Sequence, residues 1–214
     1  MQNLTTVTID LASLRHNMET VKALAPQSAV MAMLKANAYG HGIIEVADAL
    51  RNADAFAVAR IDEAIQLREA GFHHRLILLS GIQSANDLLL CSDLGLDIVV
   101  HDASAIHYFD SEKLPRKVNV WVKIDSGMHR LGITPQDSQP IIQSMLSSPQ
   151  VAEVTLMTHF SSAEDVDVET THRQHQVFEK VCDGHPLKKS LANSAAIMQH
   201  PETHESWVRP GIML

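Results

Sequence analysis

A lysine stands where a buried strand is expected to end. Lys35 follows the apolar run 29–34 and opens the octet Lys-Ala-Asn-Ala-Tyr-Gly-His-Gly, which ends at Gly42. Burial of its alkyl stem among apolar neighbours would lower the pKa of the amine and make it a nucleophile or a base. Tyr39 offers a hydroxyl in the same turn, and Gly40 allows a ligand to approach the backbone. The pattern also suits an ordinary strand-end lysine whose head group reaches solvent.

Other side chains that could take part in catalysis or binding lie at the ends of later expected strands. Lys123 lies near the end of the run 118–124, and a lysine buried there would need a counter-charge or a chemical modification. Arg130 follows between two glycines, where a planar guanidinium could bind a carboxylate or a phenolate, or could simply be solvated. His159 follows the run 151–158, and we interpret it as a hydrogen-bond partner that orients another site residue.

The last two expected strands predict an anion site. The residues that carry this prediction, in and after these runs, are Asn193, Ser194, Arg209, Gly211 and Ile212. Ser194 could cap a short helix and bind an anion there, and the backbone N–H groups after Arg209 would be bare. Phosphate commonly lies in these two loops of (β/α)8 barrels. We therefore expect an anion site across the barrel mouth from Lys35, although Ser194 could be only a cap and Gly211 only a turn glycine.

Short apolar runs alternate with segments of helical periodicity along the whole chain. The eight expected strands are 30–34, 55–59, 76–79, 97–100, 118–124, 151–158, 190–192 and 208–213. Helix starts are expected at Asp10 and Ser84, where capping side chains precede apolar stripes. Eight repeated strand–helix units predict an α/β fold, a (β/α)8 TIM-type barrel truncated after its last strand. No Gly-x-Gly-x-x-Gly follows the first strand, which argues against a dinucleotide-binding sheet.

The composition limits the classes of partner. A chain of 214 residues predicts a single domain over residues 1–214, and its net charge of −8 argues against a nucleic-acid surface. No apolar run approaches the roughly 18 residues that span a bilayer, and no signal peptide is expected. Cys91 and Cys182 lie far apart and are interpreted as reduced thiols of a cytoplasmic protein.

Thirteen histidines raise the question of a metal site. His172 and His175 could share a helix face, but no His-Glu-x-x-His motif surrounds them, and His200 and His204 lie in turn-like sequence. We therefore expect solvated helix and loop histidines and no metal.

These segments, in this order, resemble the amino-terminal barrel domain of the alanine racemase family. The motifs that carry the resemblance are Lys35–Gly42, Lys123–Gly132, Thr158–Phe160, Asn193-Ser194 and Trp207–Ile212. The likeness extends over essentially the whole chain, from Thr8 onward.

The resemblance implies a pyridoxal 5′-phosphate site. Lys35 would form a Schiff base with the cofactor and act as the base on one face of the substrate. The implied cofactor contacts are Tyr39, Asn193, Ser194, Gly211 and Ile212, with Arg209 facing the pyridine nitrogen. Arg130 would contact the cofactor phenolate and the substrate carboxylate, His159 would orient Arg209, and Lys123 matches a lysine that is carbamylated in some members.

The implied activity is the interconversion of L- and D-alanine, which supplies D-alanine for peptidoglycan in the bacterial cytoplasm. Family members are homodimers and continue into a carboxyl-terminal domain that donates a tyrosine base for the opposite face. We therefore expect the 214-residue polypeptide alone to have little turnover. Three alternatives remain: a non-catalytic pyridoxal-phosphate-binding barrel that carries or buffers the cofactor, an inactive remnant, and a related barrel decarboxylase or broad-specificity racemase.

Overall fold

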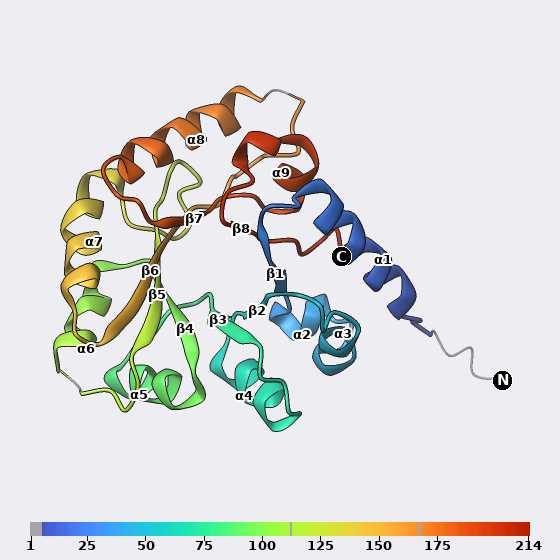
Figure 1. Ribbon diagram of the computed structural model, residues 1–214, viewed down its shortest axis with the longest axis horizontal. Helices are drawn as coiled ribbons and strands as arrows, with labels where there is room; N and C mark the ends of the chain where they lie inside the picture. Colours follow the sequence, from blue (N-terminus) through green and yellow to red (C-terminus); the bar gives the residue numbers. More distant parts are fainter. Residues whose placement is uncertain (1–5, 112, 167) are drawn as a thin grey trace.

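The chain folds into a closed barrel of eight parallel strands, surrounded by helices (Figure 1). The computed structural model describes residues 6–111, 113–166 and 168–214. The strands are β1 (Ala29–Met33), β2 (Ala55–Val58), β3 (Arg75–Leu78), β4 (Leu96–Val100), β5 (Val118–Lys123), β6 (Val151–Met157), β7 (Lys188–Ser190) and β8 (Trp207–Val208). Each pairs with the next, and β8 pairs with β1 through Ala29 opposite Trp207. The fold-class prediction of a (β/α)8 barrel is confirmed.

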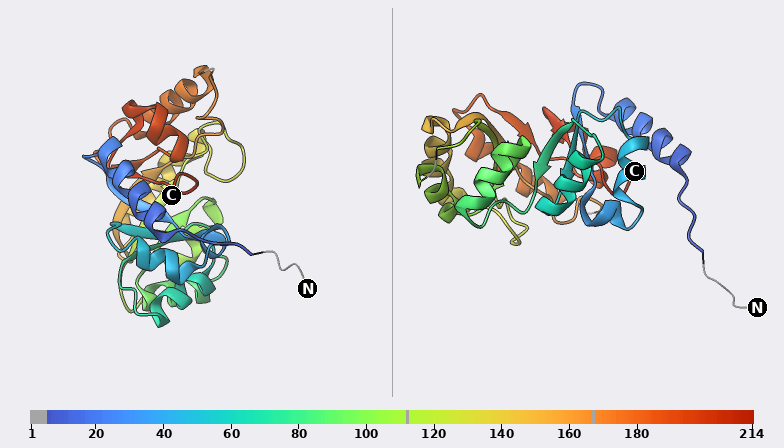
Figure 2. Two further views of the ribbon diagram at one scale, coloured as in Figure 1. Left: turned by 90° about the vertical axis from the view of Figure 1, so that its right-hand side faces the viewer. Right: turned by 90° about the horizontal axis from the view of Figure 1, so that it is seen from below.

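The helices follow the strands in alternation and cover the outside of the barrel (Figures 1 and 2). They are α1 (Leu11–Leu24), α2 (Lys35–Tyr39), α3 (Ile43–Ala49), α4 (Ile61–Glu69), α5 (Ala85–Leu94), α6 (Ile106–Ser111), α7 (Ser138–Ser147), α8 (Glu169–Cys182) and α9 (Ser194–Gln199). Short 3₁₀ turns cover Ala103–Ala105, Pro135–Asp137 and Pro201–Thr203. In Figure 2 the described residues 6–10, which precede α1, lead away from the barrel.

Two helix starts agree with their capping sequences. The Asp10 carboxylate accepts hydrogen bonds from the backbone N–H groups of Ala12 and Ser13 and caps α1. The Ser84 hydroxyl accepts from the N–H of Asp87 and caps α5. Both predicted caps are confirmed, because a side-chain acceptor satisfies donors that the first helical turn leaves unpaired.

The barrel has two apolar regions, as strand alternation requires. One lies between strands and helices and forms the larger cluster. The other fills the barrel and comprises Met31, Ala55, Ala57, Ile77, Val99, Trp121, Met157 and Trp207. Cys91 and Cys182 are buried free thiols, in α5 and α8. Among the residues that the structure describes, no helix is both long and apolar enough to cross a membrane.

A polar network lies in the barrel at the amino-terminal ends of the strands. Arg75, the first residue of β3, pairs with Asp97 of β4 at 2.5 Å, and the same carboxylate accepts from Trp121 Nε1 at 2.8 Å. The Arg75 guanidinium also lies 5.3 Å from the Trp207 ring centre. This end of the barrel is therefore filled, which leaves the carboxyl-terminal end for a ligand.

The last two strands differ from the prediction. β7 comprises Lys188–Ser190 instead of 190–192, and β8 comprises Trp207–Val208 instead of 208–213. The reason is that pairing to neighbouring strands sets these bounds, with Ser190 opposite Trp207. Pro210 lacks an N–H group and cannot continue the strand pairing, although its carbonyl still accepts from Met33.

The expectation that the histidines are solvated is wrong for His200. Its side chain is buried, with 2% of its surface exposed, and both ring nitrogens have polar neighbours. The cause is tertiary: His172 of α8 and the Ala163 carbonyl of the loop after β6 lie against a residue whose local sequence resembles an exposed turn.

Candidate active site at the barrel mouth

A cavity of about 470 Å³ opens at the carboxyl-terminal ends of the strands. All the candidate site residues from the sequence line it, namely Lys35, Tyr39, Lys123, Arg130, His159, Asn193, Ser194, Arg209, Gly211 and Ile212. They come from the ends of β1, β5, β6, β7 and β8 or the loops that follow. Parallel strands in a closed barrel bring their carboxyl ends to one face, which explains why residues so distant in sequence meet there.

The lysine octet has an unusual backbone. From Ala36 to Tyr39, four consecutive residues have φ between 51° and 55°, so α2 contains a left-handed helical turn of residues other than glycine. Such conformations cost roughly 1–2 kcal/mol per residue for L-amino acids. The sequence predicted only a polar turn at this position. Backbone strain of this kind persists where surrounding contacts enforce it, and it is concentrated at functional sites.

Two side chains that the sequence analysis did not identify hold this turn. The buried Glu63 carboxylate of α4 accepts from the backbone N–H of Asn37 at 3.0 Å and from that of Ala59 at 2.9 Å. The Asn37 side-chain oxygen accepts from the N–H of Ile43 at 2.9 Å. Glu63 thus ties the lysine turn to the neighbouring loop after β2. A signal was present in the sequence, because a glutamate three residues after a helix start can bond back to the backbone.

Arg209 is buried at the end of β8, with 4% of its surface exposed, and neutral acceptors fix its guanidinium. Nη1 donates to Ser190 Oγ at 2.7 Å, and Nη2 donates to the carbonyls of Thr158 and Leu191. Among the residues that the structure describes, Nε has no hydrogen-bond partner. Burial lowers the pKa of Arg209 to about 10, so the group remains a cation at neutral pH.

His159 contacts this arginine. Its Nδ1 lies 3.5 Å from Arg209 Nη2, and because a guanidinium only donates, the imidazole nitrogen is the acceptor. Burial, and then the charges of Arg209, Lys123 and Arg130, lower the pKa of His159 to about 3. The imidazole is therefore neutral at physiological pH and carries its proton on Nε2.

Two lysines share the cavity with the arginines. Burial lowers the pKa of Lys35, and the charges of Arg130 and Arg209 lower it further. The pKa of Lys123 falls to about 8, chiefly through burial and then through repulsion from Arg209 and Arg130. None of the described residues that line the cavity is an Asp or a Glu. The mouth is a region of converging positive charge, with two amines that deprotonate more readily than ordinary lysines.

The helix cap in this region differs from the expectation. Asn193 caps α9, since its side-chain oxygen accepts from the N–H of Ala196, whereas Ser194 is the first helical residue. The Ser194 hydroxyl instead accepts from the backbone N–H groups of Gly211 at 3.0 Å and Met213 at 3.3 Å. The N–H of Gly211 is therefore not bare, because the loop after β8 folds back onto the start of α9.

The expected position of this loop also requires correction. It does not lie across the barrel mouth from Lys35, because β8 is the immediate neighbour of β1 in the closed barrel. A Cβ placed on Gly211 would lie 2.5 Å from the Tyr39 hydroxyl. The loops after β1, β7 and β8 thus form one continuous polar wall beside Lys35, which comprises Tyr39, Asn193, Ser194, Gly211 and Ile212.

Together the fold and the site define a closed (β/α)8 barrel whose cationic mouth is centred on a strand-end lysine. The family described as alanine racemase, N-terminal domain, matches residues 9–214. The chain belongs to the alanine racemase family, and the resemblance inferred from its motifs is confirmed.

Individual relatives agree with this assignment. The chain is 42% identical over 209 residues to the alanine racemase of Halorhodospira halophila, covering 97% of this chain and 57% of the relative. It is 44% identical over 207 residues to that of Nitrosococcus oceani, covering 96% of this chain and 58% of the relative. The crystal structure of biosynthetic alanine racemase from Pseudomonas aeruginosa superimposes with a TM-score of 0.91 at 40% identity, covering 95% of this chain and 57% of that chain. The chain therefore spans less than two thirds of the length of these relatives.

Proposed function

We propose that residues 1–214 form the cofactor-binding domain of a pyridoxal 5′-phosphate-dependent alanine racemase. In this proposal the protein interconverts L- and D-alanine and supplies D-alanine for peptidoglycan in a bacterial cytoplasm. The observation that carries it is the convergence of Lys35 and Arg209 in one cationic cavity, in a chain 42% and 40% identical to two relatives named alanine racemase.

The charge of the cavity fits the cofactor. The buried Arg209 bonds only to neutral acceptors, and the described lining residues include no carboxylate. A buried cation without a counter-ion is costly, so the site favours an anionic ligand. The phosphate and the phenolate of pyridoxal phosphate would supply negative charge at two points of the cavity.

The residues of the polar wall are suited to the phosphate. Tyr39 Oη and Ser194 Oγ would bind it together with the backbone N–H groups of Gly211 and Ile212, while Asn193 holds the start of α9. Burial raises the pKa of Tyr39, so its hydroxyl stays protonated and can donate to phosphate oxygens. Ser194 Oγ accepts from the N–H groups of Gly211 and Met213, and a change of its side-chain rotamer would free the N–H of Gly211 for the phosphate.

The remaining residues of the cavity would carry out proton transfer and hold the cofactor ring and the substrate. When bound, pyridoxal phosphate withdraws electrons from the substrate Cα and makes its proton acidic. Lys35 would attach the cofactor covalently and then move that proton, which suits an amine with a lowered pKa. Arg209 would present Nε to the pyridine nitrogen as a donor that does not give up its proton, while His159 keeps the guanidinium in place. Arg130 would bind the substrate carboxylate.

Racemisation also needs a proton on the opposite face of Cα. The family resemblance assigns this second base to a tyrosine from a domain outside the matched region, contributed by the partner in a homodimer. We propose that the 214-residue polypeptide alone binds the cofactor and removes the proton from one face, but racemises alanine slowly.

The test is an absorbance titration of the purified polypeptide with pyridoxal phosphate. We expect a visible band that Lys35→Ala abolishes and that the control Lys22→Ala retains, since the Lys22 amine bonds to the Asn52 carbonyl on the surface. A band that persists in Lys35→Ala would overturn the assignment of the cofactor lysine.

A second measurement separates the racemase from a non-catalytic carrier. In D₂O, the racemase proposal predicts exchange of the Cα proton of one alanine enantiomer, faster than formation of the other enantiomer. Cofactor binding without any Cα exchange would favour the carrier.

A further inference from the structure

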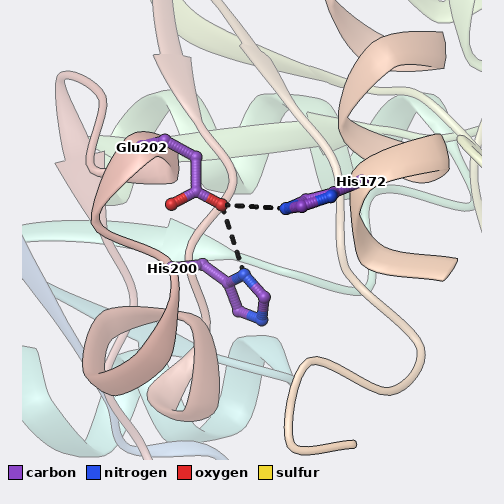
Figure 3. Close-up of side chains that lie close together, drawn as sticks. All are labelled: His172, His200 and Glu202. Atoms are coloured by element: carbon purple, nitrogen blue, oxygen red, sulfur yellow. Dashed lines mark hydrogen bonds and ion pairs between the residues drawn. The ribbon is translucent and has the colours of Figure 1, made fainter. Parts of the chain in front are cut away.

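Three side chains away from the barrel mouth direct their polar atoms toward one point (Figure 3). His172 comes from the first turn of α8, and His200 and Glu202 come from the turn that follows α9. Their ligand atoms, one from each residue, all lie within 4.8 Å of one another. None of these residues lines the barrel-mouth cavity, so the proposed racemase chemistry does not use them.

The hydrogen bonds of His200 fix which of its nitrogens faces the cluster. Nε2 lies 3.2 Å from the carbonyl oxygen of Ala163, which can only accept, so Nε2 carries a hydrogen. Nδ1 lies 3.2 Å from Glu202 Oε1. In the neutral imidazole, Nδ1 then presents a lone pair to a carboxylate oxygen. Two acceptors at this distance repel each other unless a cation lies with them, either a second ring proton or a metal ion.

The spacing of the three atoms suits a metal ion. His172 Nε2 lies 3.7 Å from the same carboxylate oxygen, compared with 3.2 Å for His200 Nδ1. With metal–ligand bonds of about 2.1 Å, adjacent ligands of a tetrahedral site lie about 3.4 Å apart. The two histidine–carboxylate distances lie on either side of this value, and the two imidazole nitrogens lie within 4.8 Å of each other, so side-chain rotations that draw the histidines together would complete the geometry.

We propose that His172, His200 and Glu202 form a binding site for a divalent transition-metal ion of the Zn²⁺ type. The ligands are His172 Nε2, His200 Nδ1 and a Glu202 carboxylate oxygen, with water in the fourth position. Imidazole and carboxylate are suitable ligands for this class of ion. The Ala163 carbonyl is the partner that a metal-binding histidine needs on its other ring nitrogen, because it fixes the tautomer.

The site would join three separate segments of the chain. It connects the start of α8, the turn after α9 and, through Ala163, the loop that follows β6. His159 lies in the same loop, four residues before Ala163. The ion therefore cross-links the outer elements on this side of the barrel, and its binding energy adds to the stability of the folded state.

The test is calorimetric titration of the chelator-treated 214-residue protein with Zn²⁺, without pyridoxal phosphate. We expect one tight equivalent and a higher melting temperature with Zn²⁺ than with chelator. His172→Ala and Glu202→Gln remove ligands that are partly exposed, so both variants are expected to fold. Each should weaken Zn²⁺ binding at least about tenfold. Loss of a residue that only orients a ligand already weakens metal binding by about this factor, and loss of a ligand should cost no less.

His16→Ala is the matched control, because His16 is exposed on helix α1 and lies outside the cluster. It should retain the tight equivalent. Absence of tight binding by the unmodified protein would overturn the proposal. Binding that is equally tight in all three variants would also overturn it. Neither result bears on the Lys35 absorbance band, so this proposal and the proposed function can fail separately.

Discussion

The hydroxyl of Tyr39 lies directly over Gly211, so that a Cβ at this glycine would lie 2.5 Å from Oη. The contact joins the loop after the first strand to the loop after the last, because β1 and β8 are neighbours in the closed barrel. Gly211 is required here for space, since its φ lies outside the left-handed region. The phosphate-binding role that we propose for both residues depends on this close approach.

Gly211→Ala is therefore expected to displace the Tyr39 hydroxyl while the barrel stays folded. Displacement of the hydroxyl would remove one hydrogen bond to a charged phosphate, worth about 1.5–3 kcal/mol, so affinity for pyridoxal phosphate should fall about tenfold or more. The measurement is an absorbance titration, with circular dichroism to verify the fold. In a Tyr39→Phe background, Gly211→Ala should reduce the affinity for pyridoxal phosphate by a smaller factor, because the oxygen that clashes with the new Cβ is absent. Equal losses in both backgrounds would contradict this explanation.

The left-handed turn after Lys35 predicts that a glycine can stabilise the protein. Ala36 is exposed with φ 55°, so Ala36→Gly relieves roughly 1–2 kcal/mol of strain and loses up to about 1 kcal/mol through the flexibility of the unfolded chain. We expect a free energy of unfolding that is unchanged or up to about 2 kcal/mol higher, measured by urea denaturation. The control Ala23→Gly, exposed in the right-handed helix α1, should lower it by up to about 1 kcal/mol. Equal destabilisation by both substitutions would contradict the strained turn.

Lys123 is expected to react with carbon dioxide near neutral pH. Carbamylation requires the neutral amine, and the pKa of Lys123 is about 8 instead of 10.5. The carbamate would also place a negative charge among Arg130 and Arg209. With ¹³C-labelled bicarbonate, NMR should show a carbamate signal that rises as the pH approaches 8 and is absent from Lys123→Ala. A signal that survives this substitution would assign the carbamate to another amine.

His159 is expected to stay neutral throughout the physiological range. Its pKa falls from 6.5 to about 3 on folding, so between these values the unfolded state binds more protons than the folded state. The free energy of unfolding therefore decreases as the pH falls from about 6.5 towards 3. Above pH 6.5 the imidazole is neutral in both states and does not make stability depend on pH. In His159→Asn, the slope of unfolding free energy against pH should be smaller between pH 3 and 6.5. The difference corresponds to up to about one proton taken up on unfolding. An NMR titration that shows His159 protonating near pH 6 would refute the assignment.

Much of this site follows from the sequence. Strand-end positions are local properties, because apolar runs mark where strands are buried and the next polar residue marks where they end. Lys35, Lys123, His159 and Arg209 could be identified in this way, and parallel strands imply that they share one end of the barrel. The caps at Asp10 and Ser84 are local in the same sense.

Other features depend on contacts between distant segments. The left-handed turn exists because the Glu63 carboxylate of α4 holds it from outside and the Asn37 side chain holds it from within, while the alanines at 36 and 38 do not favour that conformation. Barrel closure, which no single segment encodes, places Gly211 beside Tyr39 instead of across the mouth. His200 looks like an exposed turn residue in the sequence, and only the packing of α8 beside α9 buries it near His172 and Glu202. The sequence therefore determined which residue types stand at the ends of the strands, since burial patterns repeat over a few residues. The tertiary structure alone decided which of them are neighbours, since that depends on how the strands close into a ring.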